Sequence, residues 1–139
     1  MHRRVTELST SFAPDVQVLA RLRDFARDAA LQLGATVDLD LLAVVVGELT
    51  ANAAVHQSGE ARLIVTRCED GGIEVSVEDG DPAVPWVDDG DPADVLGHRG
   101  LRMVQALTPT WGVERAVEGK RVWAVVPSEA DRVPHRSRR

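Results

Sequence analysis

The spacing of apolar residues changes along this chain, and each spacing predicts a different kind of element. Across residues 15–33 the apolar positions return every three or four residues, the period of an amphipathic helix, and Gly34 follows as a C-cap candidate. A second segment of this period is expected to begin near Thr36 or Asp38, both suitable N-cap residues, and to end near Gln57. The first part of the chain is therefore predicted to hold two consecutive helices.

Alternating apolar and polar residues predict two hairpins further along the chain. Residues 61–68 and 73–79 flank an Asp-Gly-Gly turn sequence at 70–72, and the second segment has apolar residues on one side and Glu and Ser on the other. Residues 111–116 and 121–126 resemble a closing hairpin. These four segments are predicted to be strands.

The remaining segments are less regular. Residues 3–12 alternate weakly and indicate an edge strand, whereas residues 80–100 hold three prolines and five aspartates with no period, as long functional loops do. A short helix is expected at 101–107. This order of elements predicts an α+β fold: a two-layer α/β sandwich with helices on one face of a mostly antiparallel sheet. Residues 1–127 are predicted to form a single domain, and the basic segment 128–139 a disordered tail.

Bulk properties narrow the setting. The longest uninterrupted apolar run has six residues, far short of the roughly 20 that a membrane-spanning helix needs. The net charge of −6 argues against a general affinity for nucleic acid backbones. Cys68 is the single cysteine, which fits a reducing compartment. We therefore expect a soluble, cytoplasmic protein that binds neither membrane nor nucleic acid directly.

Three polar residues stand four apart on the second predicted helix. Glu48, Asn52 and His56 drift by only about 40° per step, so they share one face of the helix. The simpler interpretation is a solvated helix face. The alternative is a polar stripe set into a buried surface, because the residues around Asn52 are mostly small or apolar. In a cleft, the amide oxygen of Asn52 suits Mg²⁺, and the carboxylate of Glu48 suits proton abstraction from a hydroxyl.

Two further segments are weak signals when each is taken alone. Asp79 and Gly80 end a predicted strand, where an ordinary turn is as good an explanation as a ligand site. Gly97 and Gly100 precede a predicted helix, and free backbone N–H groups at a helix N-terminus can bind phosphate. Neither segment identifies a function by itself.

The order and spacing of all these segments are more specific. "ELTANAAVH", "VEDG", "GHRGL" and "GKRVW" follow one another across residues 11–127 as in the GHKL superfamily of gyrase, histidine-kinase and mismatch-repair ATPases. The chain resembles its small single-domain members, the anti-sigma-factor serine kinases abundant in actinobacteria. This resemblance implies the Bergerat ATP-binding fold, with residues 80–98 as the lid over ATP.

The resemblance also implies roles for residues of the helix and strand motifs. Glu48 is similar to the family's general base, and Asn52 to its Mg²⁺ ligand, which also contacts ATP. Asp79 resembles the aspartate that accepts a hydrogen bond from the adenine amino group, and Gly80 lies beside it. His56 matches the trailing histidine of the motif, for which a structural role is as good an assignment as ligand contact.

The remaining ATP-binding positions implied by the resemblance lie later in the chain. Gly97 opens the glycine-rich lid box, and Arg99, Gly100 and Leu101 end it. Lys120 falls near the last strand pair, which closes the pocket.

This chain departs from the family pattern at three places. Asp81 and Pro82 follow the DG pair where a further glycine is usual, His98 stands in the lid box at a usual glycine position, and Arg121 stands where many relatives have a threonine. Nucleotide binding is therefore a safer expectation than full catalytic competence.

Two functional hypotheses follow from these observations. The first is an ATP- and Mg²⁺-dependent protein serine/threonine kinase of the anti-sigma type, a regulator of transcription whose partners are a sigma factor, an antagonist protein or both. The second is a nucleotide-responsive protein-binding module with little or no kinase activity. The resemblance suggests a homodimer, and Trp86 is equally suited to anchoring the lid and to contacting a partner.

Overall fold

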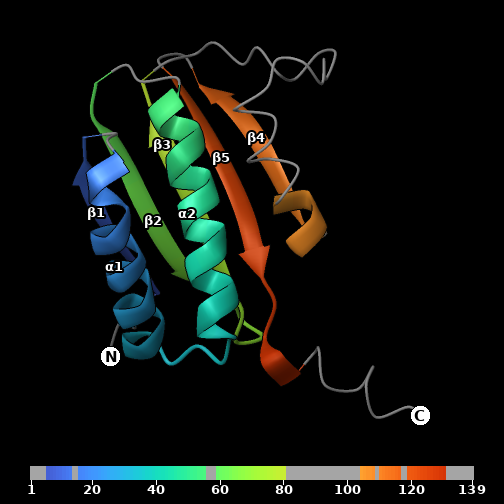
Figure 1. Ribbon diagram of the computed structural model, residues 1–139. Helices are drawn as coiled ribbons and strands as arrows, with labels where there is room; N and C mark the ends of the chain where they lie inside the picture. The colour runs from blue at the N-terminus through green and yellow to red at the C-terminus, as the bar shows by residue number, and fades with distance from the viewer. Residues whose placement is uncertain are drawn as a thin grey trace, which may run out of the picture.

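Helices cover one face of a single antiparallel sheet in this protein (Figure 1). The computed structural model describes residues 6–13, 16–55, 59–80, 104–108, 110 –116 and 119–130. The strands within these residues are β1 (Glu7–Phe12), β2 (Ala61–Arg67), β3 (Ile73–Asp79), β4 (Trp111–Ala116) and β5 (Gly119–Val126). Their order across the sheet is β1-β2-β3-β5-β4.

Every pair of neighbouring strands in this sheet is antiparallel. The helices are α1 (Leu19–Gln32), which follows a 3-10 turn, η1 (Val16–Val18), and α2 (Leu39–Val55). α1 packs against β2, and α2 packs against β3 and β5. A further helical turn lies at residues 104–107, before β4. The predicted α+β sandwich and its order of elements are therefore confirmed.

The core lies between the helices and the sheet because the strands alternate. Val75 and Val77 of β3 are buried on the side that faces the helices, which we call the helix-facing side of the sheet. Val122 and Ala124 of β5 stand opposite them in the register and are buried on the same side. Burial of such side chains contributes roughly 1.5–3 kcal/mol each to folding. The period of two predicted from the sequence thus sets which side chains enter the core.

Helix α2 begins at a side-chain cap. Asp38 Oδ1 accepts hydrogen bonds from the backbone N–H groups of Asp40, at 2.9 Å, and Leu41, at 3.1 Å, which would otherwise lack partners in the first turn. Asp38 rather than Thr36 is therefore the N-cap. The predicted end of this helix at Gln57 lies outside the described residues.

Helix α1 ends as its sequence predicts. Gly34 follows it with a φ of 73°, a left-handed conformation that glycine adopts without steric cost. The N–H of Ala35 then bonds to the carbonyl of Ala30 at 3.0 Å, so the last turn is closed. The start of α1 differs from the prediction, because the 3-10 turn occupies residues 16–18 and the α-helix begins at Leu19.

Hydrogen bonds join Thr36, Gly71 and residues 128–129 at the end of the sheet where α2 begins. The N–H of Thr36 donates to the carbonyl of Gly71 at 3.0 Å, and its carbonyl accepts from the N–H of Glu129 at 2.6 Å. The hydroxyls of Thr36 and Ser128 lie 2.9 Å apart. Ser128 is buried, and residues 128–130, which the sequence assigned to the tail, belong to the described part of the chain. Residues 131–139 lie outside the described part.

No helix formed by the described residues is long and apolar enough to cross a membrane.

Candidate functional site

The predicted binding residues that the structure describes come from three elements that meet at one end of the domain. β3 runs toward this end and stops at Asp79, β5 starts there, and the last turn of α2 ends there (Figure 1). We call this the site end of the domain. The antiparallel pairing of β3 with β5 makes the end of one strand the neighbour of the start of the other.

Asn52 is buried in the last turn of α2, near the site end. Only 3% of its surface is exposed, and it lies beside the buried residues Leu49 and Ala53 of α2. Among the described residues, neither its Oδ1 nor its Nδ2 has a hydrogen-bond partner. A buried polar group without a partner costs about 1–3 kcal/mol. The solvated-face interpretation is therefore wrong for Asn52, and the amide is suited to a ligand outside the chain.

Glu48 occupies a different environment one turn earlier. It is half-buried and lines a hollow of about 400 Å³ between α1 and α2. The hollow is lined by Arg23, Arg27, Asp40, Ala43, Val44 and Glu48. Along the predicted polar stripe, Glu48 is therefore accessible to solvent, whereas Asn52 is buried. His56, the third residue of the stripe, lies outside the described residues.

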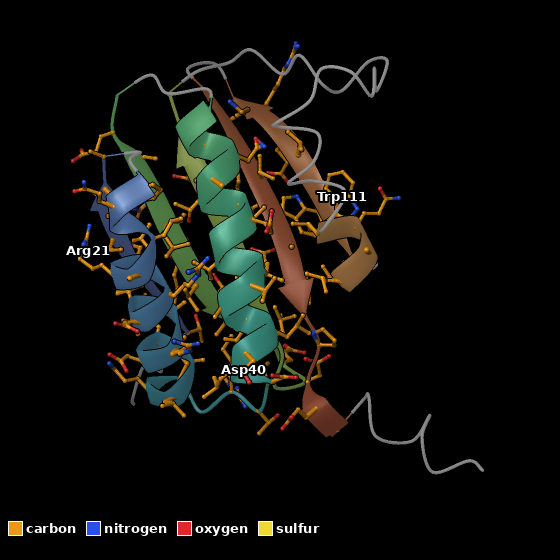
Figure 2. The ribbon with its side chains drawn as sticks, in the orientation of Figure 1. Arg21, Asp40 and Trp111 are labelled. Carbon is orange, nitrogen blue, oxygen red and sulfur yellow. The ribbon has the colours of Figure 1, made fainter. Side chains whose placement is uncertain are left out.

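Two arginines of α1 line this hollow and lie close to α2. Arg27 Nη2 lies 3.9 Å from Asp40 Oδ1. Asp40 lies near the start of α2 (Figure 2). A side chain on Gly47 would bring its Cβ to 2.6 Å from a guanidinium nitrogen of Arg23. Gly47 therefore lets Arg23 lie directly against the backbone of α2.

Asp79 and Lys120 form an ion pair at the site end. They are direct partners across β3 and β5, and Lys120 Nζ lies 3.1 Å from Asp79 Oδ1. Their side chains are only 6% and 1% exposed, respectively. Asp79 stands two residues from Val77, and Lys120 stands two residues from Val122. Asp79 and Lys120 therefore lie on the same, helix-facing side of the sheet as these valines. The sequence assigned both residues to the site but did not predict that they bond to each other.

Arg121 faces away from this pair, although the sequence comparison counted it as a departure within the site. It points to the outer side of the sheet, where its guanidinium lies 2.5 Å from Glu74 and 3.2 Å from Glu114. Its guanidinium carbon also lies 6.0 Å from the ring centre of Trp123. Because neighbouring residues of a strand face opposite sides, the helix-facing Lys120 excludes Arg121 from the site. This alternation was the sequence signal that could have separated them.

The positions predicted for the lid lie outside the described residues. They are the binding residues Gly97, Arg99, Gly100 and Leu101, the departures Asp81, Pro82 and His98, and Trp86. Gly80 is described and exposed, directly after β3. In the described ranges, no three His, Cys, Asp or Glu side chains gather as a metal-binding group.

Comparison with solved structures shows that this fold is shared with histidine kinase domains. The chain is similar to the histidine kinase domain of the blue-light activated histidine kinase of Erythrobacter litoralis, with a TM-score of 0.54 and 20% identity over 89% of this chain and 65% of that one. The longer structure of the same kinase matches with a TM-score of 0.54 and 20% identity over 84% of this chain and 42% of that one. This chain thus spans less than two thirds of either.

These similarities show the fold alone, an α/β sandwich that this chain shares with histidine kinase domains. No protein-family model matches the chain, and no curated protein matches it either.

Proposed function

We propose that this protein is a regulatory ATP-binding protein that acts as a protein serine kinase of the anti-sigma type. Its nucleotide site would lie at the site end of the domain, and its acceptor would be a serine of an antagonist partner. The observation that carries this proposal is the buried amide of Asn52, which has no partner among the described residues. The described residues leave this amide unsatisfied, and a bound ligand would satisfy it.

The described residues suit a nucleotide with its metal ion. Asp79 would accept a hydrogen bond from the base, and Gly80 would let the backbone approach it. The oxygen of Asn52 is the type of ligand that Mg²⁺ prefers, and such sites usually complete their coordination with waters and phosphate oxygens. Bound Mg²⁺ would neutralise negative charge on the phosphates. Asn52 is therefore the residue proposed to hold the metal.

Glu48 is proposed as the general base. Its carboxylate would take the proton from the serine hydroxyl while the hydroxyl oxygen bonds to the γ-phosphorus. The bond from that phosphorus to the bridging oxygen would break, and ADP would leave. Because Glu48 lines the hollow between α1 and α2, an acceptor segment could reach it from the solvent side. In phosphoryl transfer the protein contributes mainly such positioning and charge stabilisation.

The second candidate is a nucleotide-responsive binding module without phosphoryl transfer. It is favoured by the difference between Glu48, which is half-buried in an open hollow, and Asn52, which is fully enclosed. In such a protein the hollow would be part of a partner surface, and Glu48 would have no catalytic role.

Phosphate transfer separates the two candidates. The protein is incubated with γ-labelled ATP, Mg²⁺ and a candidate antagonist, and labelled serine is sought by mass spectrometry. A kinase labels the serine, and Glu48→Gln abolishes labelling while ATP still binds. Binding without labelling of any antagonist that forms a complex with the protein supports the module instead.

A further inference from the structure

The ammonium group of Lys120 is buried beside the carboxylate that is proposed to bind the base. Lys120 Nζ lies 3.1 Å from Asp79 Oδ1, and the two side chains are 1% and 6% exposed. An ammonium carries three donors, and a carboxylate has about four acceptor positions. The bond between them uses one donor of the ammonium and one acceptor position of the carboxylate.

Sheet stability is a poor explanation for this pair. Removing two charges from water carries a large penalty, and a buried ion pair often stabilises a fold no better than apolar residues of similar size. The next pair on the same side of the sheet is Val77 opposite Val122, and both are buried. A second apolar pair would join β3 to β5 without the penalty. The charges are better explained by a ligand with a polar edge.

A purine carrying an amino group has an edge complementary to these two groups. The amino group of adenine donates hydrogen bonds, and the ring nitrogens on either side of it accept them. A carboxylate beside an ammonium presents the opposite order of acceptor and donor. We infer that Lys120 is a specificity-determining residue of the site, and that its ammonium donates a hydrogen bond to a ring nitrogen of the purine whose amino group Asp79 binds.

This inference rests on the proposed nucleotide site and adds a second contact to the base. Asp79 alone would read the amino group. With Lys120 beside it, the site also requires an acceptor next to that amino group. A purine that keeps the amino group but has a carbon in place of the ring nitrogen would set that carbon against a buried ammonium donor. Polar sites discriminate strongly against such a mismatch.

Ring-substituted nucleotides test this requirement. Binding of ATP, 1-deaza-ATP and 7-deaza-ATP is measured by calorimetry on the wild type and on Lys120→Met. Each analogue replaces one of the two candidate ring nitrogens with a carbon. We expect one analogue to bind the wild type about tenfold more weakly than ATP, as for loss of a hydrogen bond to a charged group. In Lys120→Met, ATP and that analogue should bind with equal affinity.

A second variant keeps the test decisive if Lys120→Met fails to fold. Lys120→Met combined with Asp79→Asn removes both charges together, so no buried carboxylate is left unpaired, and circular dichroism checks its fold. It too should lose discrimination between ATP and the analogue. Equal binding of ATP and both analogues by the wild type would overturn the inference while the nucleotide site stands. Discrimination that persists in the folded variants would also overturn it. Failure of the wild type to bind any of the nucleotides would overturn the proposed function itself.

Discussion

Gly119 lies so close to Asp79 that a Cβ atom on Gly119 would overlap the carbonyl oxygen of Asp79. The φ of Gly119 is 152°, which residues with side chains rarely adopt. This close approach lets β5 begin beside the end of β3, and so brings Lys120 opposite Asp79. The geometry of the proposed site therefore requires glycine at position 119, because any side chain there would overlap Asp79.

Replacing Gly119 with alanine should damage both the fold and the site. Backbone strain of this kind costs on the order of 1–3 kcal/mol, and the overlap with Asp79 would displace the start of β5. We expect Gly119→Ala to lower the free energy of unfolding in urea and to weaken ATP binding. Gly34→Ala is the control, because Gly34 also has positive φ but has open space around its Cβ position. If both variants bind ATP equally well, the proposed role of the close approach is wrong.

The buried amide of Asn52 predicts opposite effects on stability and binding. Asn52→Leu removes a polar group that lacks a partner among the described residues, so without nucleotide the variant should be as stable as the wild type or more stable, by up to about 1–3 kcal/mol. It should lose the extra thermal stability that Mg²⁺ and ATP give the wild type. Thermal unfolding with and without both ligands measures the two effects.

Thr50 provides the matched control for Asn52. Its hydroxyl is also buried and lacks a partner within the described part of the chain, but two residues correspond to about 200° of rotation around the helix, so it faces another side. Thr50→Val should keep the stabilisation by Mg²⁺ and ATP. A strongly destabilised Asn52→Leu, with Thr50→Val unaffected, would show that Asn52 has a structural role instead.

Arg121 lies on the outer side of the sheet, so its replacement should not affect the nucleotide. Arg121→Thr removes the ion pairs with Glu74 and Glu114, and pairs of this kind contribute about 1 kcal/mol or less. We expect a small loss of stability in urea and an ATP affinity within about twofold of the wild type, the range expected when no hydrogen bond to the ligand is removed. A large loss of affinity would contradict the assignment of Arg121 to the outer side.

The thiol of Cys68 should react slowly near neutral pH. Partial burial raises its pKa above the ordinary value of 9.0, and the carboxylates of Asp70 and Glu74 raise it further, although Arg67 opposes them. The thiolate is the reactive form, so alkylation of the folded protein at pH 8 should be slower than alkylation of the unfolded chain. Its rate should rise through a midpoint above pH 9.0.

An isosteric variant tests the cause of this shift. Asp70→Asn keeps the side-chain oxygen that accepts from the N–H of Gly72 at 2.9 Å but removes the negative charge. It should therefore lower the midpoint for alkylation of Cys68. A midpoint in the wild type at or below the ordinary value would show that the thiol is neither desolvated nor near these charges in solution.

Local patterns were sufficient to predict most of the fold. The helix period located α1 and α2, Asp38 and Gly34 mark helix ends where capping chemistry places them, and alternation located the strands. The burial of Ser128 was not predicted, because its partner Thr36 is far away in the sequence.

The site was only partly predictable, because it also depends on contacts between residues that are far apart in the sequence. Periodicity puts Glu48 and Asn52 on one stripe, but tertiary packing decides that Asn52 is enclosed and that Glu48 remains accessible. The bond between Asp79 and Lys120 depends on the register between two strands separated by a long segment. Alternation along β5 separates Lys120 from Arg121, but no short stretch of sequence determines which residue of β3 stands opposite Lys120.

Titration with ATP, with and without Mg²⁺, tests the central claim most directly when the wild type is compared with Asp79→Asn. The wild type should bind ATP more tightly with Mg²⁺ present, and Asp79→Asn, shown by circular dichroism to be folded, should bind about tenfold more weakly or worse. Absence of ATP binding by the wild type, or an Asp79→Asn variant with unchanged affinity, would contradict the assignment of a nucleotide site to this end of the sheet.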